Sequence, residues 1–267
     1  MEYVMGIDLG TSSVKAVLTD RNGRIAAMAQ KGYDVEIPQA GYAQQSPQNW
    51  WEQTKRVIRD VIKSGDISSG QVKAVGFSGQ MHGLVALDRE KKPLMPALIW
   101  MDQRSKRQQE TILKAVEEEG LEEQLMNRPV PGMLICSLLW MKEHLPDVYE
   151  KTAYVLLPKD YIRLQLGKTI ETDETDGAGS LAFSVRDRGW CWHLLEKLEI
   201  RKDLFPPVVK PCEITGRITR EAAMETGLQE GTLLAAGGAD SAMQLTGNGV
   251  IRDGALAVNI GTASQIL

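Results

Sequence analysis

The sequence predicts an α/β fold with a mixed sheet, three antiparallel strands followed by parallel strands, flanked by helices. Apolar runs at residues 3–7, 14–18 and 24–31 are separated by tight turns, which is typical of consecutive antiparallel strands. A later apolar strand, residues 72–77, comes after an amphipathic helix, and further short strands then alternate with helices. That alternation is typical of parallel strands joined by helical crossovers.

The first two strands enclose a turn that carries chemistry. Asp8 ends the first strand, and the small residues Gly10, Thr11 and Ser12 form the turn. Backbone N–H groups and small hydroxyls suit phosphate oxygens, and a carboxylate beside them suits a Mg²⁺ ion that accompanies phosphates. An ordinary hairpin is the alternative, because Gly, Ser and Thr are common in turns.

A helix is expected after the third strand. Ser46 is a typical N-cap, Pro47 suits the first helical position, and Gly65 ends the apolar periodicity. Strands are expected after it at residues 72–77, 84–87, 97–100, 214–219, 233–236 and 255–260. The second and third of these strands are expected to pair with each other. Helices are expected at residues 106–119, 138–144, 160–166, 190–198, 220–227 and 241–246. Residues 169–187 are rich in Thr, Asp and Gly and predict a surface loop.

Asp240 lies at the turn from a strand of small residues, 233–236, into a helix. It follows Gly237 and Gly238, so its carboxylate can project into a cleft. The N-terminus of a helix favours an ionised carboxylate and also attracts phosphate. A general base and a simple N-cap both fit this position, and the residues alone do not decide between them.

The end of the chain repeats its beginning. Residues 258–265 match residues 7–14, so that Gly261 and Thr262 stand where the first turn has its Gly-Thr pair. The repeat indicates a duplicated fold in which two such turns face each other across a cleft. A chance match is the alternative, because the motif is short.

This repeat also predicts the domain organisation. One strand and half a turn do not make a lobe. We therefore expect a whole first lobe over residues 1–246 and only the opening hairpin of a second, truncated lobe over residues 247–267.

Composition and charge exclude several classes of protein. The net charge is −4, without a run of Lys and Arg, which argues against a nucleic-acid partner. No apolar stretch approaches the roughly 20 residues that span a bilayer, and the acidic N-terminus is unlike a signal peptide. The three cysteines and three histidines lack metal-ligand spacing. Free thiols and a cytoplasmic location are expected instead.

Five motifs resemble the FGGY family of carbohydrate kinases. They are Gly6–Lys15, Gly79–Gly83, Trp100–Arg104, Gly237–Asp240 and Asn259–Thr262. The first and last are shared with the larger group that includes actin and hexokinase, so the resemblance implies a ribonuclease-H-like lobe. The Gln-Met-His-Gly sequence at residues 80–83 is the specific element, and it looks like the xylulokinase branch. Ser137 departs from the family, which often has Lys there, and no function is carried onto that segment.

The resemblance implies ATP-dependent phosphorylation of D-xylulose to D-xylulose 5-phosphate, assisted by Mg²⁺. Asp240 is then the catalytic base, and Asp8 holds the Mg²⁺ ion through water. The implied sugar contacts are Gln80, Met81, His82, Trp100, Asp102 and Asp240, and the implied phosphate contacts are Gly10, Thr11, Ser12, Gly261 and Thr262. A core Met, a satisfied His and an Asp–Arg pair with Arg104 are the structural alternatives at these positions.

The expected partners are the sugar and ATP, without nucleic acid or membrane, and a homodimer is left open. Two other functions also stay open. One is an FGGY kinase for another ketopentose or a polyol, and the other is a non-catalytic nucleotide-binding protein like actin or the heat-shock chaperones. Because the adenosine-binding lobe is not expected in this chain, we expect it to phosphorylate sugar barely or not at all.

Overall fold

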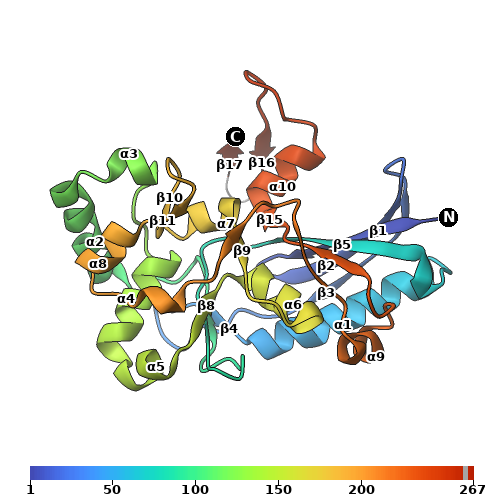
Figure 1. Ribbon diagram of the computed structural model, residues 1–267, viewed down its shortest axis with the longest axis horizontal. Coiled ribbons are helices and arrows are strands. Elements are labelled where there is room, and N and C mark those ends of the chain that lie inside the picture. Colours follow the sequence, from blue (N-terminus) through green and yellow to red (C-terminus); the bar gives the residue numbers. More distant parts are fainter. Residues whose placement is uncertain (261–263) are drawn as a thin grey trace.

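A mixed sheet lies at the centre of the computed structural model, which describes residues 1–260 and 264–267 (Figure 1). The strand order is β13–β14–β5–β1–β2–β3, with β15 paired to β5. These strands are β1 (Tyr3–Leu9), β2 (Ser13–Asp20), β3 (Ile25–Gly32), β5 (Val72–Gly79), β13 (Ile214–Arg217), β14 (Leu233–Ala235) and β15 (Gly238–Ala239). β1, β2 and β3 are antiparallel, whereas β14 and β15 run parallel to β5, and β5 runs parallel to β1. The predicted fold class is confirmed.

Ten α-helices are present in the described part of the chain. They are α1 (Pro47–Ser64), α2 (Lys106–Glu119), α3 (Glu122–Leu125), α4 (Leu134–His144), α5 (Pro146–Lys151), α6 (Pro158–Gly167), α7 (Glu174–Gly179), α8 (Trp192–Lys197), α9 (Arg220–Thr226) and α10 (Asp240–Gly247). The start of α1 follows the sequence prediction, because the Ser46 side chain accepts a hydrogen bond from the Asn49 amide and Pro47 is the first helical residue.

One face of the sheet is covered by α1, α6 and α9. α1 packs on β2 and β3, while α6 packs on β5 and β1, and the three helices contact one another. Alternate residues of β1, namely Met5, Ile7 and Leu9, point into this layer and are buried. Trp50 of α1 is fully buried against them in the same core. Burial of this continuous apolar layer is the main contribution to the stability of the sheet.

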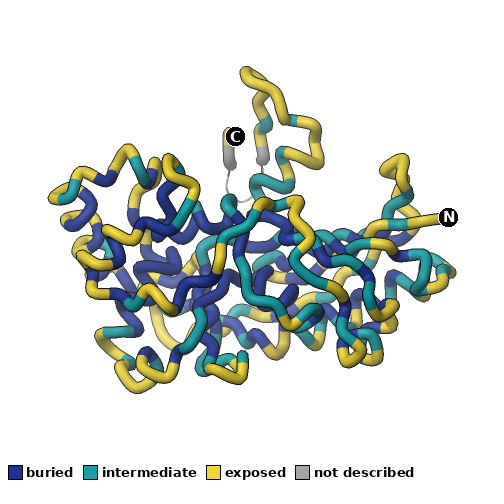
Figure 2. Tube along the Cα trace, in the orientation of Figure 1, coloured by how far each residue is buried: buried dark blue, intermediate teal, exposed yellow. Residues whose placement is uncertain are grey.

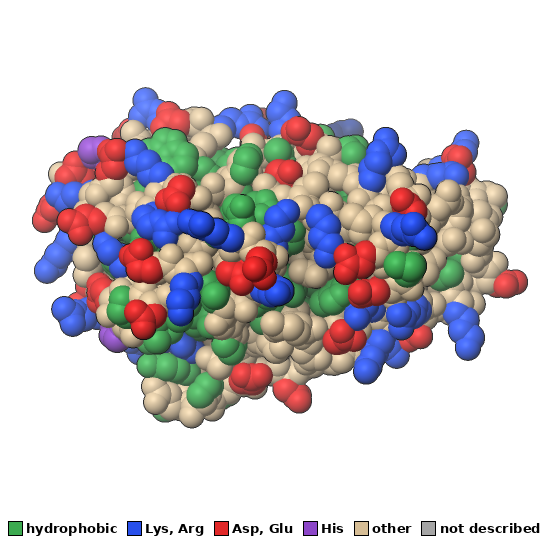
Figure 3. Space-filling view, turned by 60° about the horizontal axis from the view of Figure 1, so that its bottom comes forward, with side chains coloured by type: hydrophobic (Ala, Val, Ile, Leu, Met, Phe, Trp, Pro, Cys, Tyr) green, Lys and Arg blue, Asp and Glu red, His purple; other side chains and the backbone are tan. Residues whose placement is uncertain are grey.

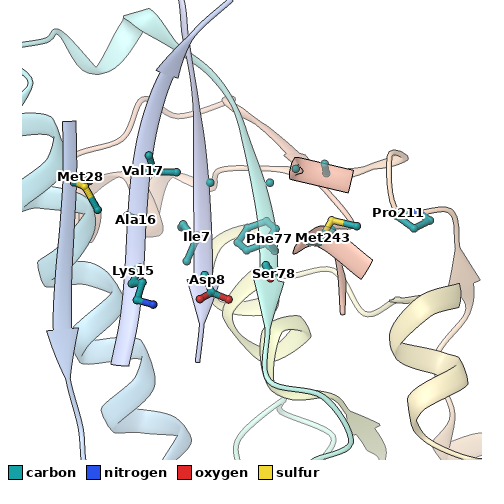
Figure 4. A pocket seen from close by; sticks show the side chains of 15 residues that line it. Ile7, Asp8, Lys15, Ala16, Val17, Met28, Phe77, Ser78, Pro211 and Met243 are labelled. Atoms are coloured by element: carbon teal, nitrogen blue, oxygen red, sulfur yellow. The ribbon is translucent and has the colours of Figure 1, made fainter. Parts of the chain in front are cut away.

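The opposite face of the sheet is more open. A cavity of about 590 Å³ lies on it, lined by residues of β1, β2, β3 and β5 and by Met243 of α10. Figure 4 shows Asp8, Lys15 and Ser78 together at one end of this cavity. The remaining lining is mostly apolar, so charge is concentrated at the carboxyl end of β1.

A second core lies beside the sheet, within the group of helices that includes α2, α4 and α8 (Figures 1 and 2). Every residue from Leu134 to Met141 of α4 is buried. Two-stranded ribbons complete this region and its junction with the sheet. They pair β4 (Gln44–Gln45) with β7 (Ala97–Leu98), β6 (Val85–Leu87) with β8 (Tyr154–Leu156), β9 (Thr172–Asp173) with β12 (Val208–Val209), and β10 (Phe183–Ser184) with β11 (Gly189–Trp190).

Two expectations about local structure are wrong. The strands at residues 84–87 and 97–100 do not form a ladder with each other, because β6 pairs with β8 and β7 pairs with β4; a single bridge between Leu84 and Leu98 joins them. Residues 169–187 are not a surface loop. They contain β9, α7 and β10, and most of their residues are buried.

The last described strands, β16 (Val258–Ile260) and β17 (Ser264–Ile266), form an antiparallel hairpin beyond α10 (Figure 1). The expected second hairpin is therefore present. Its turn, which includes Gly261 and Thr262, lies outside the described residues. The segment that leads into it, residues 251–256, is exposed (Figure 2).

The surface shows no concentration of one charge on the face drawn in Figure 3, where Lys and Arg side chains are interspersed with Asp and Glu. Within the described ranges, none of the helices is long and apolar enough to cross a membrane. The thiols of Cys136, Cys191 and Cys212 are all free, and the first two are buried.

Candidate functional site

Neighbouring strand ends bring Asp8 and Asp240 to one edge of the sheet. In the pairing register Asp8 lies opposite Ser78 of β5, and Ser78 lies opposite Gly238 of β15. α10 begins at Asp240, two residues after Gly238. Because the carboxyl ends of parallel strands form a common edge, polar groups that follow them can act on one ligand.

The pKa of the Asp240 carboxyl is raised, although part of the side chain reaches solvent. Burial raises the pKa of its carboxyl, the Ser241 amide opposes this rise, and the charge of Asp8 adds to it. Gly237 has a φ of +77°, and a Cβ there would lie 2.2 Å from the Phe77 carbonyl oxygen. Only glycine permits this approach, so the turn that carries Asp240 is held close to β5.

The turn after β1 is held by side chains from three other segments. The Tyr33 hydroxyl donates to the Gly10 carbonyl, and Gln45 Nε2 donates to the Thr11 carbonyl at 2.7 Å. Trp100 Nε1 donates to Thr11 Oγ1 at 2.9 Å. Because that oxygen accepts from the indole, the Thr11 hydroxyl hydrogen is left to donate to a ligand.

Gln80 supports this turn through hydrogen bonds and is almost completely buried. Its backbone amide donates to the Leu9 carbonyl at 2.8 Å, and its Nε2 donates to Gln45 Oε1 at 2.9 Å. Trp50 Nε1 donates to the same Gln45 oxygen at 3.2 Å. Gln80 therefore supports the Thr11 turn through Gln45, and its expected contact with a sugar stays a prediction.

Met81 and His82 come after β5 and Gln80, and they contact α10 and α7. His82 Nδ1 lies 2.6 Å from the carbonyl oxygen of Gly179, the last residue of α7. A carbonyl only accepts, so a neutral His82 carries its hydrogen on Nδ1 and keeps Nε2 as a hydrogen-bond acceptor. The Ser241 hydroxyl donates to Met81 Sδ at 3.3 Å. The expected sugar-binding pair is thus connected to the start of α10, beside Asp240.

Trp100 and Asp102 have different surroundings. Trp100 is 47% exposed, so part of the residue is accessible to a ligand. Asp102 is fully buried, and its Oδ2 accepts from the Ala43 amide at 2.7 Å and from Arg104 Nε at 2.8 Å. The Asp–Arg pair that the sequence left open is present here, and the expected contact of Asp102 with sugar stays a prediction.

The carboxylate oxygens of Asp8 suit a Mg²⁺ ion that binds together with phosphate. Across the described ranges, no group of three or more His, Cys, Asp or Glu side chains is arranged to hold a metal. Mg²⁺ is commonly held by one or two carboxylates together with substrate phosphates and water. Asp8, whose charge helps raise the pKa of the Asp240 carboxyl, fits that arrangement and does not fit a closed structural site.

Several residues of this site were not found from the sequence. They are Tyr33, Gln45, Thr175, Gly179 and Ser241. Each is a single polar residue or glycine in a two-residue strand, in an irregular segment or near a helix end, and its partner is distant in the chain. Neither periodicity nor a local motif marks such residues. Two of them, Thr175 and Gly179, lie within residues 169–187, where the sequence predicted a surface loop.

Comparison with known proteins identifies the family. The N-terminal domain of the FGGY family of carbohydrate kinases matches residues 3–247. The chain belongs to the FGGY family of carbohydrate kinases. The resemblance stated from the motifs is thereby confirmed, and so is the kinase-type fold.

Two FGGY relatives named as xylulose kinases illustrate the similarity. The chain is 36% identical over 269 residues to the xylulose kinase of Bacillus subtilis, covering 100% of this chain and 53% of the relative. A crystal structure described as a xyloylose kinase from Brucella ovis superposes with a TM-score of 0.92 at 30% identity, covering 99% of this chain and 54% of that one. The chain spans about half the length of the curated relatives it matches.

The fold does not by itself specify the sugar. A gluconate kinase from Lactobacillus acidophilus also superposes with a TM-score of 0.92, at 26% identity, over 99% of this chain and 53% of that one. Specificity within the FGGY family must therefore come from individual side chains at the site.

Proposed function

We propose that this chain forms the sugar-binding half of an ATP-dependent kinase that converts D-xylulose to D-xylulose 5-phosphate. Family membership and the relatives named as xylulose kinases support the reaction class. The observation that carries the proposal is the position of Asp240, at a glycine-fixed turn near Asp8 and beside the Met81–His82 pair.

Asp240 acts as the general base in this proposal. Its carboxylate takes the proton from a sugar hydroxyl while the hydroxyl oxygen bonds to the γ-phosphorus of ATP and the bond to ADP breaks. A carboxyl pKa raised by burial and by Asp8 makes Asp240 a stronger base than an ordinary aspartate. The effect of such a base is typically about 10²–10⁴-fold in rate.

The remaining site residues bind and orient the reactants. His82 Nε2 accepts from a sugar hydroxyl, Met81 contacts an apolar part of the sugar, and the exposed ring of Trp100 packs on it. Gln80 and Asp102 are assigned to the sugar site as well, and their burial indicates that they act by holding Gln45 and Arg104 in place.

Phosphate binding is assigned to the first turn and its repeat. Gly10, Thr11 and Ser12 donate to phosphate oxygens, with Thr11 oriented by Trp100. Gly261 and Thr262, at corresponding places in the second hairpin, are proposed to do so from the other side of the cleft. Mg²⁺ held through Asp8 supplies charge neutralisation on the phosphates.

The proposal extends to the organisation of the whole protein. Residues 1–246 constitute the sugar-binding lobe, and the hairpin within residues 247–267 begins the ATP-binding lobe, as the repeat of the Gly-Thr turn suggests. Buried free thiols at Cys136 and Cys191 support a reducing, cytoplasmic compartment. The assembly state is not assigned.

Asp240→Asn tests the catalytic assignment in a protein that contains both halves of the kinase. We expect sugar-dependent ADP release to fall by about 10²-fold or more, with D-xylulose binding retained by calorimetry. Asp253→Asn, the same substitution at an exposed aspartate outside the site, is the matched control and should retain turnover. Undiminished sugar-dependent turnover in Asp240→Asn would show that another group is the base.

A kinase for a different sugar is the second candidate, favoured by the equally close superposition of a gluconate kinase. Turnover of D-gluconate or a polyol at a higher kcat/KM than D-xylulose would establish it. ATP binding without phosphorylation of any sugar would instead indicate a non-catalytic nucleotide-binding protein.

A further inference from the structure

A buried ionic cluster lies directly behind the proposed sugar site. Lys159, the second residue of α6, is 1% exposed. Its Nζ lies 2.7 Å from Asp160 Oδ1, 2.8 Å from Asp173 Oδ2 and 3.2 Å from Asp176 Oδ2, and all three carboxylates are fully buried. None of these groups has a part in the proposed phosphoryl transfer.

The buried charges of this cluster are paired with one another. Arg163 adds a second buried cation, 3.1 Å from Asp160 Oδ1. Burial and the charges of Asp173 and Asp160 raise the pKa of Asp176 well above its usual value, although Lys159 opposes that rise. Glu171, whose Oε2 lies 2.7 Å from Arg163 Nη1, adds a fourth carboxylate to the cluster. Charges buried this deeply are tolerated only when they are paired, so the cluster constrains the positions of α6 and α7.

The cluster is connected to the Asp240 turn by two hydrogen bonds. Asp173 is the N-cap of α7, and its Oδ1 accepts from the Thr175 amide at 2.8 Å and from the Thr175 hydroxyl. Thr175 Oγ1 in turn accepts from the Ala239 amide at 2.9 Å. Ala239 immediately precedes Asp240, so the Thr175 hydroxyl joins the cluster to the backbone that carries Asp240.

The other end of α7 reaches the sugar side of the site. Its last residue, Gly179, bonds to His82 through its carbonyl oxygen. A Cβ at Gly179 would lie 3.0 Å from Met81 Cε and 3.3 Å from His82 Nδ1. The six-residue helix α7 therefore contacts the Ala239 amide, next to Asp240, at one end and the Met81–His82 pair at the other.

We propose that Thr175 is a positioning residue, and that α7, anchored by Lys159, sets the position of Asp240 relative to His82. This assignment deepens the proposed kinase function and rests on it for its functional consequence. The hydrogen bond from the Ala239 amide to Thr175 Oγ1 can be tested separately from the kinase function. Loss of the Thr175 hydroxyl leaves the Ala239 amide without its hydrogen-bond acceptor. The turn that carries Asp240 is then held by one hydrogen bond fewer.

Amide hydrogen exchange on this chain tests the structural part. Thr175→Val keeps the branched shape and removes the hydroxyl, whereas Thr175→Ser keeps the hydroxyl. We expect the Ala239 amide to exchange about five-fold faster or more in Thr175→Val, as the loss of one hydrogen bond predicts, and at the wild-type rate in Thr175→Ser. Thr219→Val is the matched control, because Thr219 Oγ1 accepts from the Ala222 amide at the start of α9; it should leave Ala239 unchanged.

Calorimetric titration with D-xylulose tests the functional part with the same variants. We expect weaker binding in Thr175→Val and wild-type binding in Thr175→Ser and Thr219→Val. Unchanged exchange at Ala239 in Thr175→Val would overturn the proposal. Faster exchange with unchanged D-xylulose affinity would overturn the positioning role.

Two further outcomes are distinguishable. A wild-type chain that binds no sugar would contradict the kinase proposal, while exchange at Ala239 would still decide whether Thr175 holds the turn. Should Thr175→Val fail to fold, Thr175→Ala, which leaves space for water at the amide, replaces it with the same expected order of exchange rates.

Discussion

Trp100 Nε1 donates a hydrogen bond to Thr11 Oγ1 across 2.9 Å, joining two residues that are 89 positions apart in the chain. The indole, two residues beyond β7, thus orients the Thr11 hydroxyl, while Trp100 stays 47% exposed. One side chain therefore links the proposed phosphate turn to the proposed sugar site.

Trp100→Phe is expected to weaken D-xylulose binding by about five-fold, because it retains an aromatic ring and loses the bond to Thr11. The measurement is quenching or shift of tryptophan fluorescence on titration with D-xylulose, which should be largely abolished in this variant. Trp192→Phe is the control, since Trp192 is similarly exposed at 42% but lies on α8. A full fluorescence response in Trp100→Phe would place the sugar elsewhere.

His82→Asn should reduce D-xylulose affinity by about ten-fold, because asparagine tolerates the φ of +73° at this position but lacks an acceptor at the place of Nε2. Calorimetry gives the affinity, and circular dichroism checks the fold. His193→Asn is the comparison, because that histidine contacts Glu119 on the surface and has no part in the site. Equal affinity in His82→Asn and wild type would remove His82 from the sugar contacts.

Asp240→Asn should raise the melting temperature at neutral and alkaline pH. Burial and the charge of Asp8 raise the pKa of Asp240 in the folded state. A raised carboxyl pKa stabilises the folded state fully below the unfolded pKa, roughly 3.9, and this contribution is lost as pH rises through the folded pKa. The advantage of Asn should therefore disappear on acidification. Thermal unfolding across the pH range, with the exposed Asp253→Asn as control, measures this; an advantage that grows toward acid pH would contradict it.

Lys159→Met should destabilise the chain by about 3–5 kcal/mol, because it leaves buried carboxylates without their counter-charge. Urea unfolding gives the difference in unfolding free energy. Lys168→Met, which removes a half-exposed lysine paired with Glu221, should change it by less than about 0.5 kcal/mol. Equal stability of the two variants would mean that the cluster does not constrain α6 and α7.

Features specified by neighbouring residues were predictable from the sequence. The first three strands, the Ser46 cap of α1 and the glycine turn before Asp240 depend on residues close together in the chain, and the structure has all three. In the structure, the motifs at Asp8 and Asp240 lie at one edge of the sheet. Local signals were sufficient wherever a cap, turn or alternation decided the conformation.

Features decided by distant contacts were not predictable in this way. Four of the six residues of α7 are two glycines, a Thr and an Asp, so its helix propensity is low. It forms because Asp173 caps it and Lys159, from α6, neutralises Asp173 and Asp176. Likewise, the partners of β6 and β7 come from segments that no periodicity connects to them.

Calorimetric titration of this chain with D-xylulose, D-ribulose and glycerol tests the central claim most directly. The account predicts saturable binding of D-xylulose, tighter than that of the other two, and its loss in His82→Asn. Equal or tighter binding of D-ribulose or glycerol, or no saturable heat with D-xylulose at any concentration, would contradict it.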